Sequence, residues 1–105
     1  MIRGSFKYNS EFLFESGEKL AGLEIVYHHT GDYSPDKKVI WICHALTANS
    51  NPEEWWDGLV GPGKLFDTRE YYIICANMIG SCYGSSGPAT AEPAGAPYML
   101  SFPQV

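Results

Sequence analysis

The chain has 105 residues, which allows one small hydrophobic core and at most one domain. Its formal net charge is −5 and its Lys and Arg residues are scattered. This excludes nucleic acid and anionic membrane as main partners, because both attract clustered basic residues.

The start of the chain, residues 1–8, lacks the apolar stretch of a secretory signal. No segment has the ~20 apolar residues of a membrane span. The three cysteines, Cys43, Cys75 and Cys82, are widely spaced and odd in number, a usage typical of reduced thiols. We therefore expect a cytoplasmic protein.

Two strands are predicted in the first third of the chain, at residues 11–14 and 23–29. Residues 16–19, Ser-Gly-Glu-Lys, lie between them and predict a hairpin turn. Residues 30–38 contain Gly, Pro and two Asp and predict a surface loop.

Two continuous apolar runs, residues 39–43 and 71–76, predict strands buried on both faces, as in a parallel sheet covered by helices. The segment between them is long enough for a crossover that contains a helix. Asn51 is the expected N-cap of that helix, Pro52 its first residue, and Glu54 the partner in a capping box. This strand–helix–strand unit predicts the α/β class.

The same helix is expected to continue through an apolar stripe and to end at a Gly-Pro-Gly turn, residues 61–63, because Pro cannot continue a helix and Gly costs the most entropy there. The stripe consists of Trp55, Trp56, Leu59 and Val60. After Ala76 the chain is rich in Gly and Pro, which predicts a long irregular segment without a closing element.

The tetrapeptide His44-Ala45-Leu46-Thr47 directly follows the first buried run. A turn there puts backbone amides at the carboxyl edge of a parallel sheet, where such folds bind ligands. A rigid amide at this place can stabilise the oxyanion of a tetrahedral intermediate. We expect the amide of Leu46 to be the donor and the ring of His44 to support the loop. On this motif alone, an ordinary loop with one histidine remains an equal alternative.

Residues 58–64 nearly match a phosphate-binding loop, but Leu65 replaces the hydroxyl residue that would ligate magnesium, and no buried strand precedes the motif. We expect a turn that ends the helix instead, without a phosphate on Lys64.

No metal site is predicted, because His28, His29 and His44 lack zinc-type spacing with the cysteines, and adjacent residues of a strand point to opposite faces. Cys43 and Cys75 lie in apolar runs and are expected to be buried thiols.

A catalytic nucleophile is not found in this sequence. The elbow pattern Gly-x-Ser-x-Gly does not occur, and residues 84–87 have the wrong spacing. Ser85 and Ser86 are expected to be loop residues that bond to nearby backbone. Cys82 has no partner base in the sequence pattern that would activate it.

In series, the motifs resemble those of the homoserine O-acetyltransferases, and the resemblance runs from about Phe12 to the last residue. It rests on these segments, in order: His44-Ala45-Leu46-Thr47, Trp55-Trp56-Asp57, Val60-Gly61-Pro62-Gly63-Lys64, Asp67-Thr68, Ile74-Cys75-Ala76-Asn77, Gly80-Ser81-Cys82, Gly84-Ser85-Ser86-Gly87-Pro88 and Pro97-Tyr98. The sequence departs from the family at Ala48, where Gly is usual, and residues 89–95 share only its Pro and Gly content.

The resemblance implies that residues 1–105 form the N-terminal part of an α/β-hydrolase domain. Its sheet would be mostly parallel with an antiparallel start, and the domain would be incomplete. The nucleophilic serine, the acid and the histidine of the triad would then lie beyond Val105. The implied reaction transfers an acetyl group from acetyl-CoA, a co-substrate, to the hydroxyl of L-homoserine on the route to methionine. No bound cofactor is implied, and the full-length enzyme is expected to be a homodimer.

The 105-residue chain alone is expected to be inactive, marginally stable and prone to aggregate, because the sheet would keep an open edge. Two alternatives stay open. One is a related acyltransferase with another donor or acceptor, such as a succinyl group or serine. The other is a small binding domain without enzymatic activity.

Overall fold

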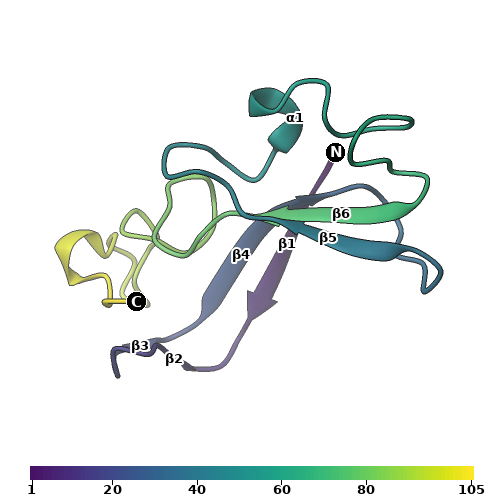
Figure 1. The fold of residues 1–105 in the computed structure, drawn as a ribbon. Helices are drawn as coiled ribbons and strands as arrows, with labels where there is room; N and C mark the ends of the chain where they lie inside the picture. Colours follow the sequence, from purple (N-terminus) through teal and green to yellow (C-terminus); the bar gives the residue numbers. More distant parts are fainter. The chain divides into compact units, whose positions relative to one another are not determined.

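The computed structural model describes all residues, 1–105, and consists mainly of strands and loops (Figure 1). Its elements in chain order are β1 (Ile2–Tyr8), β2 (Phe12–Leu13), β3 (Lys19–Leu20), β4 (Leu23–His29), β5 (Lys38–Ile42), α1 (Pro52–Trp55), β6 (Tyr71–Ala76) and a 3₁₀ turn η1 (Met99–Ser101). None of the helices has the length and apolar character needed to cross a bilayer.

The main sheet has the strand order β1-β4-β6-β5. β5 and β6 are parallel over five residue pairs, from Lys38 opposite Tyr71 to Ile42 opposite Cys75. β4 and β6 are antiparallel, and His28 lies opposite Cys75 in that pair. The sheet is therefore mixed, with an antiparallel start and a parallel pair joined by a crossover, which confirms the predicted class.

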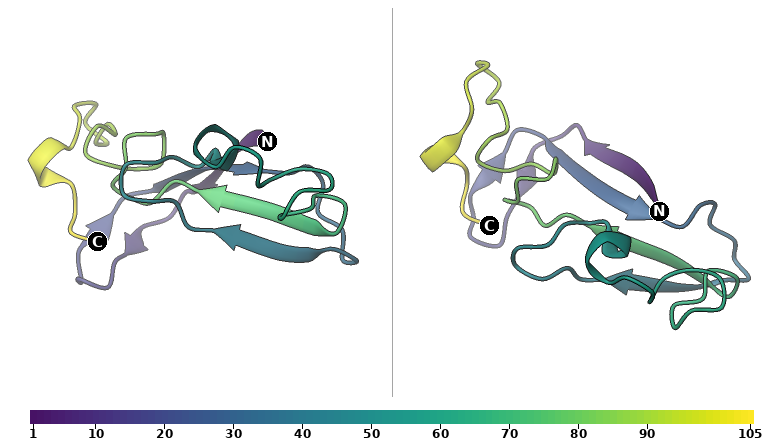
Figure 2. Two further views of the ribbon diagram at one scale, coloured as in Figure 1. Left: turned by 45° about the horizontal axis from the view of Figure 1, so that its top comes forward. Right: turned by 90° about the horizontal axis from the view of Figure 1, so that it is seen from above.

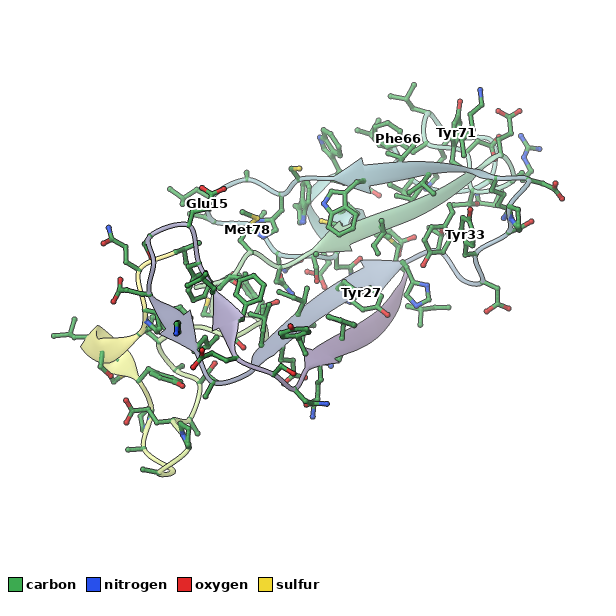
Figure 3. All side chains as sticks on the ribbon, turned by 90° about the horizontal axis from the view of Figure 1, so that it is seen from below. Glu15, Tyr27, Tyr33, Phe66, Tyr71 and Met78 are labelled. Carbon is green, nitrogen blue, oxygen red and sulfur yellow. The ribbon has the colours of Figure 1, made fainter.

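The chain divides into two compact units, each described here by itself. The first consists of residues 1–4 and 27–76 and has its core on one face of β5 and β6. Ile42, Val60, Ile73 and Cys75 are buried there, and Trp55, Phe66 and Tyr71 pack against them. Phe66 and Tyr71 are labelled in Figure 3. Seen from above, α1 lies over the same two strands, so the crossover covers this face (Figure 2).

The opposite face of β5 is open. Val39 is 53% exposed and Trp41 59% exposed, whereas Ile42, on the covered face, is 5% exposed. The prediction that this strand is buried on both faces is therefore wrong within residues 1–105, because no segment of the chain covers its second face. Cys43 is also exposed rather than buried, since it lies in the turn just after β5, whereas Cys75 is fully buried.

The helix α1 is shorter than the sequence predicts. It begins at Pro52 as expected but ends at Trp55, and Trp56 caps it through a hydrogen bond from its N–H to the Pro52 carbonyl oxygen, 2.7 Å. Gly58 has a φ of +82°, a left-handed value that Gly adopts without steric cost. The chain thus leaves the helix before Leu59 and Val60, and the Gly-Pro-Gly turn is not what ends it.

The predicted capping box is also absent. The side chain of Asn51 accepts no hydrogen bond from the helix, and the N–H of Asn51 is bonded to the Oδ1 of Asn49 at 2.8 Å. Glu54 instead accepts hydrogen bonds from the side-chain amides of Asn49 and Asn51, at 3.0 and 3.2 Å. These bonds hold the pKa of the Glu54 carboxyl below its ordinary value.

The second unit, residues 5–26 and 77–105, contains the short β2–β3 hairpin and its own core of Phe14, Leu20 and Leu23. A hairpin turn lies where it was predicted, except that Lys19 belongs to β3. The predicted strand 23–29 is β4, and it is β3 that pairs with β2 in the hairpin. The first strand, β1, was not predicted. Its alternation of apolar and polar side chains from Ile2 to Tyr8 carried the signal.

Within this second unit, the irregular segment after Ala76 is hydrogen-bonded to the first half of β4. The Oγ of Ser85 accepts a hydrogen bond from the N–H of Val26 at 2.9 Å, and the Oγ of Ser86 accepts one from the N–H of Glu24 at 2.8 Å. The N–H groups of Asn77 and Ser86 donate to the carbonyl oxygens of Val26 and Glu24. These residues take the place of a neighbouring strand, which explains the two serines.

Candidate functional site

The site is the turn that follows β5, where the sequence places His44-Ala45-Leu46-Thr47. The N–H of Ala48 donates to the carbonyl oxygen of Ala45 at 3.0 Å, so residues 45–48 form a four-residue turn with Leu46 as its second member. The Leu46 side chain is 99% exposed. None of the hydrogen bonds in the structure involves Leu46, so its N–H is free to bind a ligand.

The incoming end of this turn is attached to the core. The backbone N–H of His44 donates to the thiol of Cys75, which lies on the neighbouring strand β6. Burial raises the pKa of the Cys75 thiol to about 11, so the thiol is neutral at physiological pH, and its sulfur accepts the N–H of His44. The Nδ1 of His44 lies 2.8 Å from the carbonyl oxygen of Ala45, so the ring contacts the turn itself.

The outgoing end is attached by side chains of α1 and β4. The indole N–H of Trp55 donates to the carbonyl oxygen of Asn49 at 3.0 Å. The Oγ of Ser50 lies 2.7 Å from the Nδ1 of His28, and Ser50 is only 1% exposed. The turn is therefore held by the core before residue 45 and by a polar cluster after residue 48.

His28 is kept neutral by its surroundings. Its pKa is lowered from the ordinary value of 6.5, chiefly by burial and further by the α-amino group of Met1 and by Arg3, while Glu54 and Glu53 act in the opposite direction. The sequence did not single out His28 for the site. Its position depends on which residue it meets across the sheet, and the strand pattern does not contain that information.

In the phosphate-loop-like segment, residues 58–64, four backbone N–H groups are hydrogen-bonded within the chain, including that of Leu59. The N–H of Lys64 donates to the Gly61 carbonyl oxygen and that of Gly61 to the Phe66 carbonyl oxygen, at 3.1 and 3.2 Å. The N–H of Gly63 bonds to the carboxylate of Asp67, which also forms an ion pair with Arg69 at 2.6 Å. These hydrogen bonds lower the pKa of the Asp67 carboxyl. The segment is therefore a turn held by its own hydrogen bonds.

No protein-family model matches the chain. The homoserine O-acetyltransferase of Natronomonas pharaonis is 44% identical over 109 residues, which cover 90% of this chain and 27% of that protein. That of Cyclobacterium marinum is 45% identical over 107 residues, covering 100% of this chain and 30% of that protein. The crystal structure of the Bacillus anthracis homoserine O-acetyltransferase matches with a TM-score of 0.80 and 31% identity, over 98% of this chain and 32% of that chain.

The chain belongs to the homoserine O-acetyltransferase family and matches one segment of its members. It spans between 27 and 30% of the length of these curated relatives. Esterase E22 also matches, with a TM-score of 0.82 and 24% identity, over 97% of this chain and 32% of that chain. At that identity the match shows only the α/β-hydrolase fold.

This homoserine O-acetyltransferase segment contains no activated nucleophile. Ser85 and Ser86 are each 3% exposed, and both hydroxyls are bonded to the backbone of β4. Their bonds reach a distant strand, in contrast to the expected local ones. Cys82 is exposed, but no histidine or carboxylate is bonded to it. No group of three or more His, Cys, Asp or Glu side chains is placed to hold a metal ion.

Proposed function

We propose that this chain is the oxyanion-loop segment of a homoserine O-acetyltransferase, which transfers an acetyl group from acetyl-CoA to the side-chain hydroxyl of L-homoserine on the route to methionine. The observation that carries the proposal is the unbonded N–H of Leu46, in a turn at the carboxyl end of the parallel strand β5. Support also comes from identities of 44 and 45% to relatives that bear this name.

In the proposed reaction a serine attacks the thioester carbonyl carbon of acetyl-CoA, and negative charge develops on the carbonyl oxygen. The N–H of Leu46 donates to that oxygen, and a second N–H comes from the residue after the serine. The thiol of CoA leaves with a proton from histidine, and the homoserine hydroxyl then takes the acetyl group from the serine. The serine, the histidine and the acid are supplied by residues other than 1–105.

His44 acts as a support in this scheme and not as the base. Its backbone N–H is bonded to Cys75 and its ring contacts Ala45, so both groups hold the turn. A fixed donor is worth more than a mobile one, because a preorganised amide needs no reorganisation when charge develops. The proposal includes no bound cofactor, since acetyl-CoA is consumed as a co-substrate.

The test uses the complete reading frame that contains residues 1–105, expressed and purified beside the 105-residue chain. Thiol release from acetyl-CoA and the mass of the acetylated product are measured with L-homoserine, and then with L-serine or succinyl-CoA in its place. We expect acetylation of homoserine by the complete product and none by the 105-residue chain, which has no elbow serine.

A preference for succinyl-CoA or serine would favour the related acyltransferase. No acyl transfer at all by the complete product would favour the small binding domain. Acetylation by the 105-residue chain alone would contradict the assignment of the nucleophile to other residues.

A cytoplasmic location and a homodimer complete the proposal. The location is supported by the three unpaired cysteines, which are typical of a reducing compartment. The homodimer rests on the family resemblance, and light scattering of the complete product measures it directly.

A further inference from the structure

The two ends of the turn at Leu46 are held by residues that lie opposite one another on neighbouring strands of the sheet. Cys75 of β6 lies opposite Ile42 of β5 on one side and opposite His28 of β4 on the other. Residues directly opposite each other in a sheet have their side chains on the same face. His28, Cys75 and Ile42 therefore present their side chains to the face that carries the core of the first unit.

Both ends of the turn are hydrogen-bonded to residues of this set. Cys75 receives the backbone N–H of His44 at the incoming end, and His28 meets the hydroxyl of Ser50 at the outgoing end, 2.7 Å away. Leu46 lies between these two points and has no hydrogen bond of its own. The direction of the Leu46 N–H therefore depends on the hydrogen bond that closes the turn, from Ala48 to Ala45, and on how the two ends of the turn are held.

We propose that His28 is a positioning residue for the Leu46 amide, acting through its hydrogen bond to Ser50. This inference rests on the proposed function, in which that amide binds the oxyanion. His28 touches neither substrate nor the reacting atoms. Its contribution is to hold the outgoing end of the turn against the sheet, beside Asn49, which is bonded to Trp55 and Glu54 of α1.

The chemistry of the contact suits this role. With a neutral imidazole whose Nδ1 has no proton, the Ser50 hydroxyl donates to the ring nitrogen. Burial disfavours a charged ring most, the α-amino group of Met1 and Arg3 act in the same direction, and the opposing effects of Glu54 and Glu53 are smaller, so the pKa of His28 is lowered. Since Ser50 is 1% exposed, water has little access to replace the ring if it is removed.

The test compares four variants of the complete reading-frame product: His28→Ala, Ser50→Ala, the double variant and His28→Asn. Asn places its Oδ1 near the position of the ring Nδ1 and keeps the acceptor. The control is His29→Ala, the neighbouring residue of β4, whose ring nitrogen contacts the backbone of Gly31. The kcat and KM for both substrates are measured, with active sites counted by acylation burst.

We expect kcat per active site to fall on the order of tenfold in His28→Ala and in Ser50→Ala, with KM nearly unchanged, because the lost interaction acts on the transition state. The double variant should be no worse than either single one, and His28→Asn should recover most of the rate. A merely structural role would reduce the number of active sites and leave kcat per site as in the wild type.

Hydrogen exchange at the amides of Ala48 and Asn51 gives a readout independent of activity, because both are hydrogen-bonded in the structure. It should accelerate in His28→Ala and not in His29→Ala. If the wild type does not acetylate homoserine but the exchange effect is present, the proposed function fails and the attachment by His28 stands. Unchanged exchange together with unchanged kcat in His28→Ala would overturn the positioning role.

Discussion

At the residue scale, the three cysteines differ in what their surroundings do to them. Cys75 is fully buried, and that burial raises the pKa of its thiol to about 11. Cys43 and Cys82 lie in turns after β5 and β6 and are exposed. Since only the thiolate is nucleophilic, the buried thiol is shielded twice, by access and by protonation.

This difference predicts the pattern of alkylation. Iodoacetamide at neutral pH should modify Cys43 and Cys82 of the folded chain and leave Cys75 intact, whereas all three should react in denaturant. Peptide mass spectrometry of the modified chain measures each site. Modification of Cys75 in the native protein at the rate of Cys82 would show that the attachment of His44 to Cys75 opens readily.

At the element scale, β5 has one packed face and one open face. Ile40 packs against the core of the first unit, while Val39 and Trp41 are exposed. β5 also lies at the end of the strand order, so one of its edges is unpaired. An apolar face next to an open edge is a template for pairing with another chain.

We therefore expect the 105-residue chain to self-associate, and replacing Val39 and Trp41 by Thr to reduce this association without loss of the sheet. Thr keeps a high strand propensity while it adds a polar group. Sedimentation velocity over a range of concentrations measures the association. The matched control is Ile40→Thr, which should lower stability by about 1–3 kcal/mol through a buried hydroxyl and lost packing. A monomeric wild-type chain at all concentrations would contradict this prediction.

The elements also show where sequence reasoning succeeded and where it could not. β6 was predicted with the observed bounds, because a short apolar run between polar residues is typical of a buried strand. α1 was predicted too long, because the apolar stripe in the sequence continues to Val60. In the structure Val60 packs into the core from a turn that follows the helix. The role of Ser85 and Ser86 as partners of β4 depends on a contact about 60 residues away, which no local pattern contains.

At the scale of the whole molecule, sequence and structure agree on the family and on the place of the candidate turn after β5. The motif order indicated the family, and the site turn after β5 could be located from the buried run that precedes it. The attachments of that turn could not be located in the same way. They depend on the register that brings His28 opposite Cys75, and register follows from pairing in three dimensions.

The central claim, that the Leu46 amide is an oxyanion donor, is tested most directly by Leu46→Pro in the complete reading-frame product. Proline removes the N–H, and the second position of a four-residue turn suits it because Leu46 does not have a positive φ. Leu46→Ala is the matched control, since it keeps the amide and changes only an exposed side chain.

We expect kcat for acetyl transfer to fall by roughly 10²–10³ in Leu46→Pro, with KM for acetyl-CoA and the melting temperature nearly unchanged, while Leu46→Ala stays within a few-fold of the wild type. A Leu46→Pro enzyme that is folded and keeps the kcat of Leu46→Ala would contradict the account.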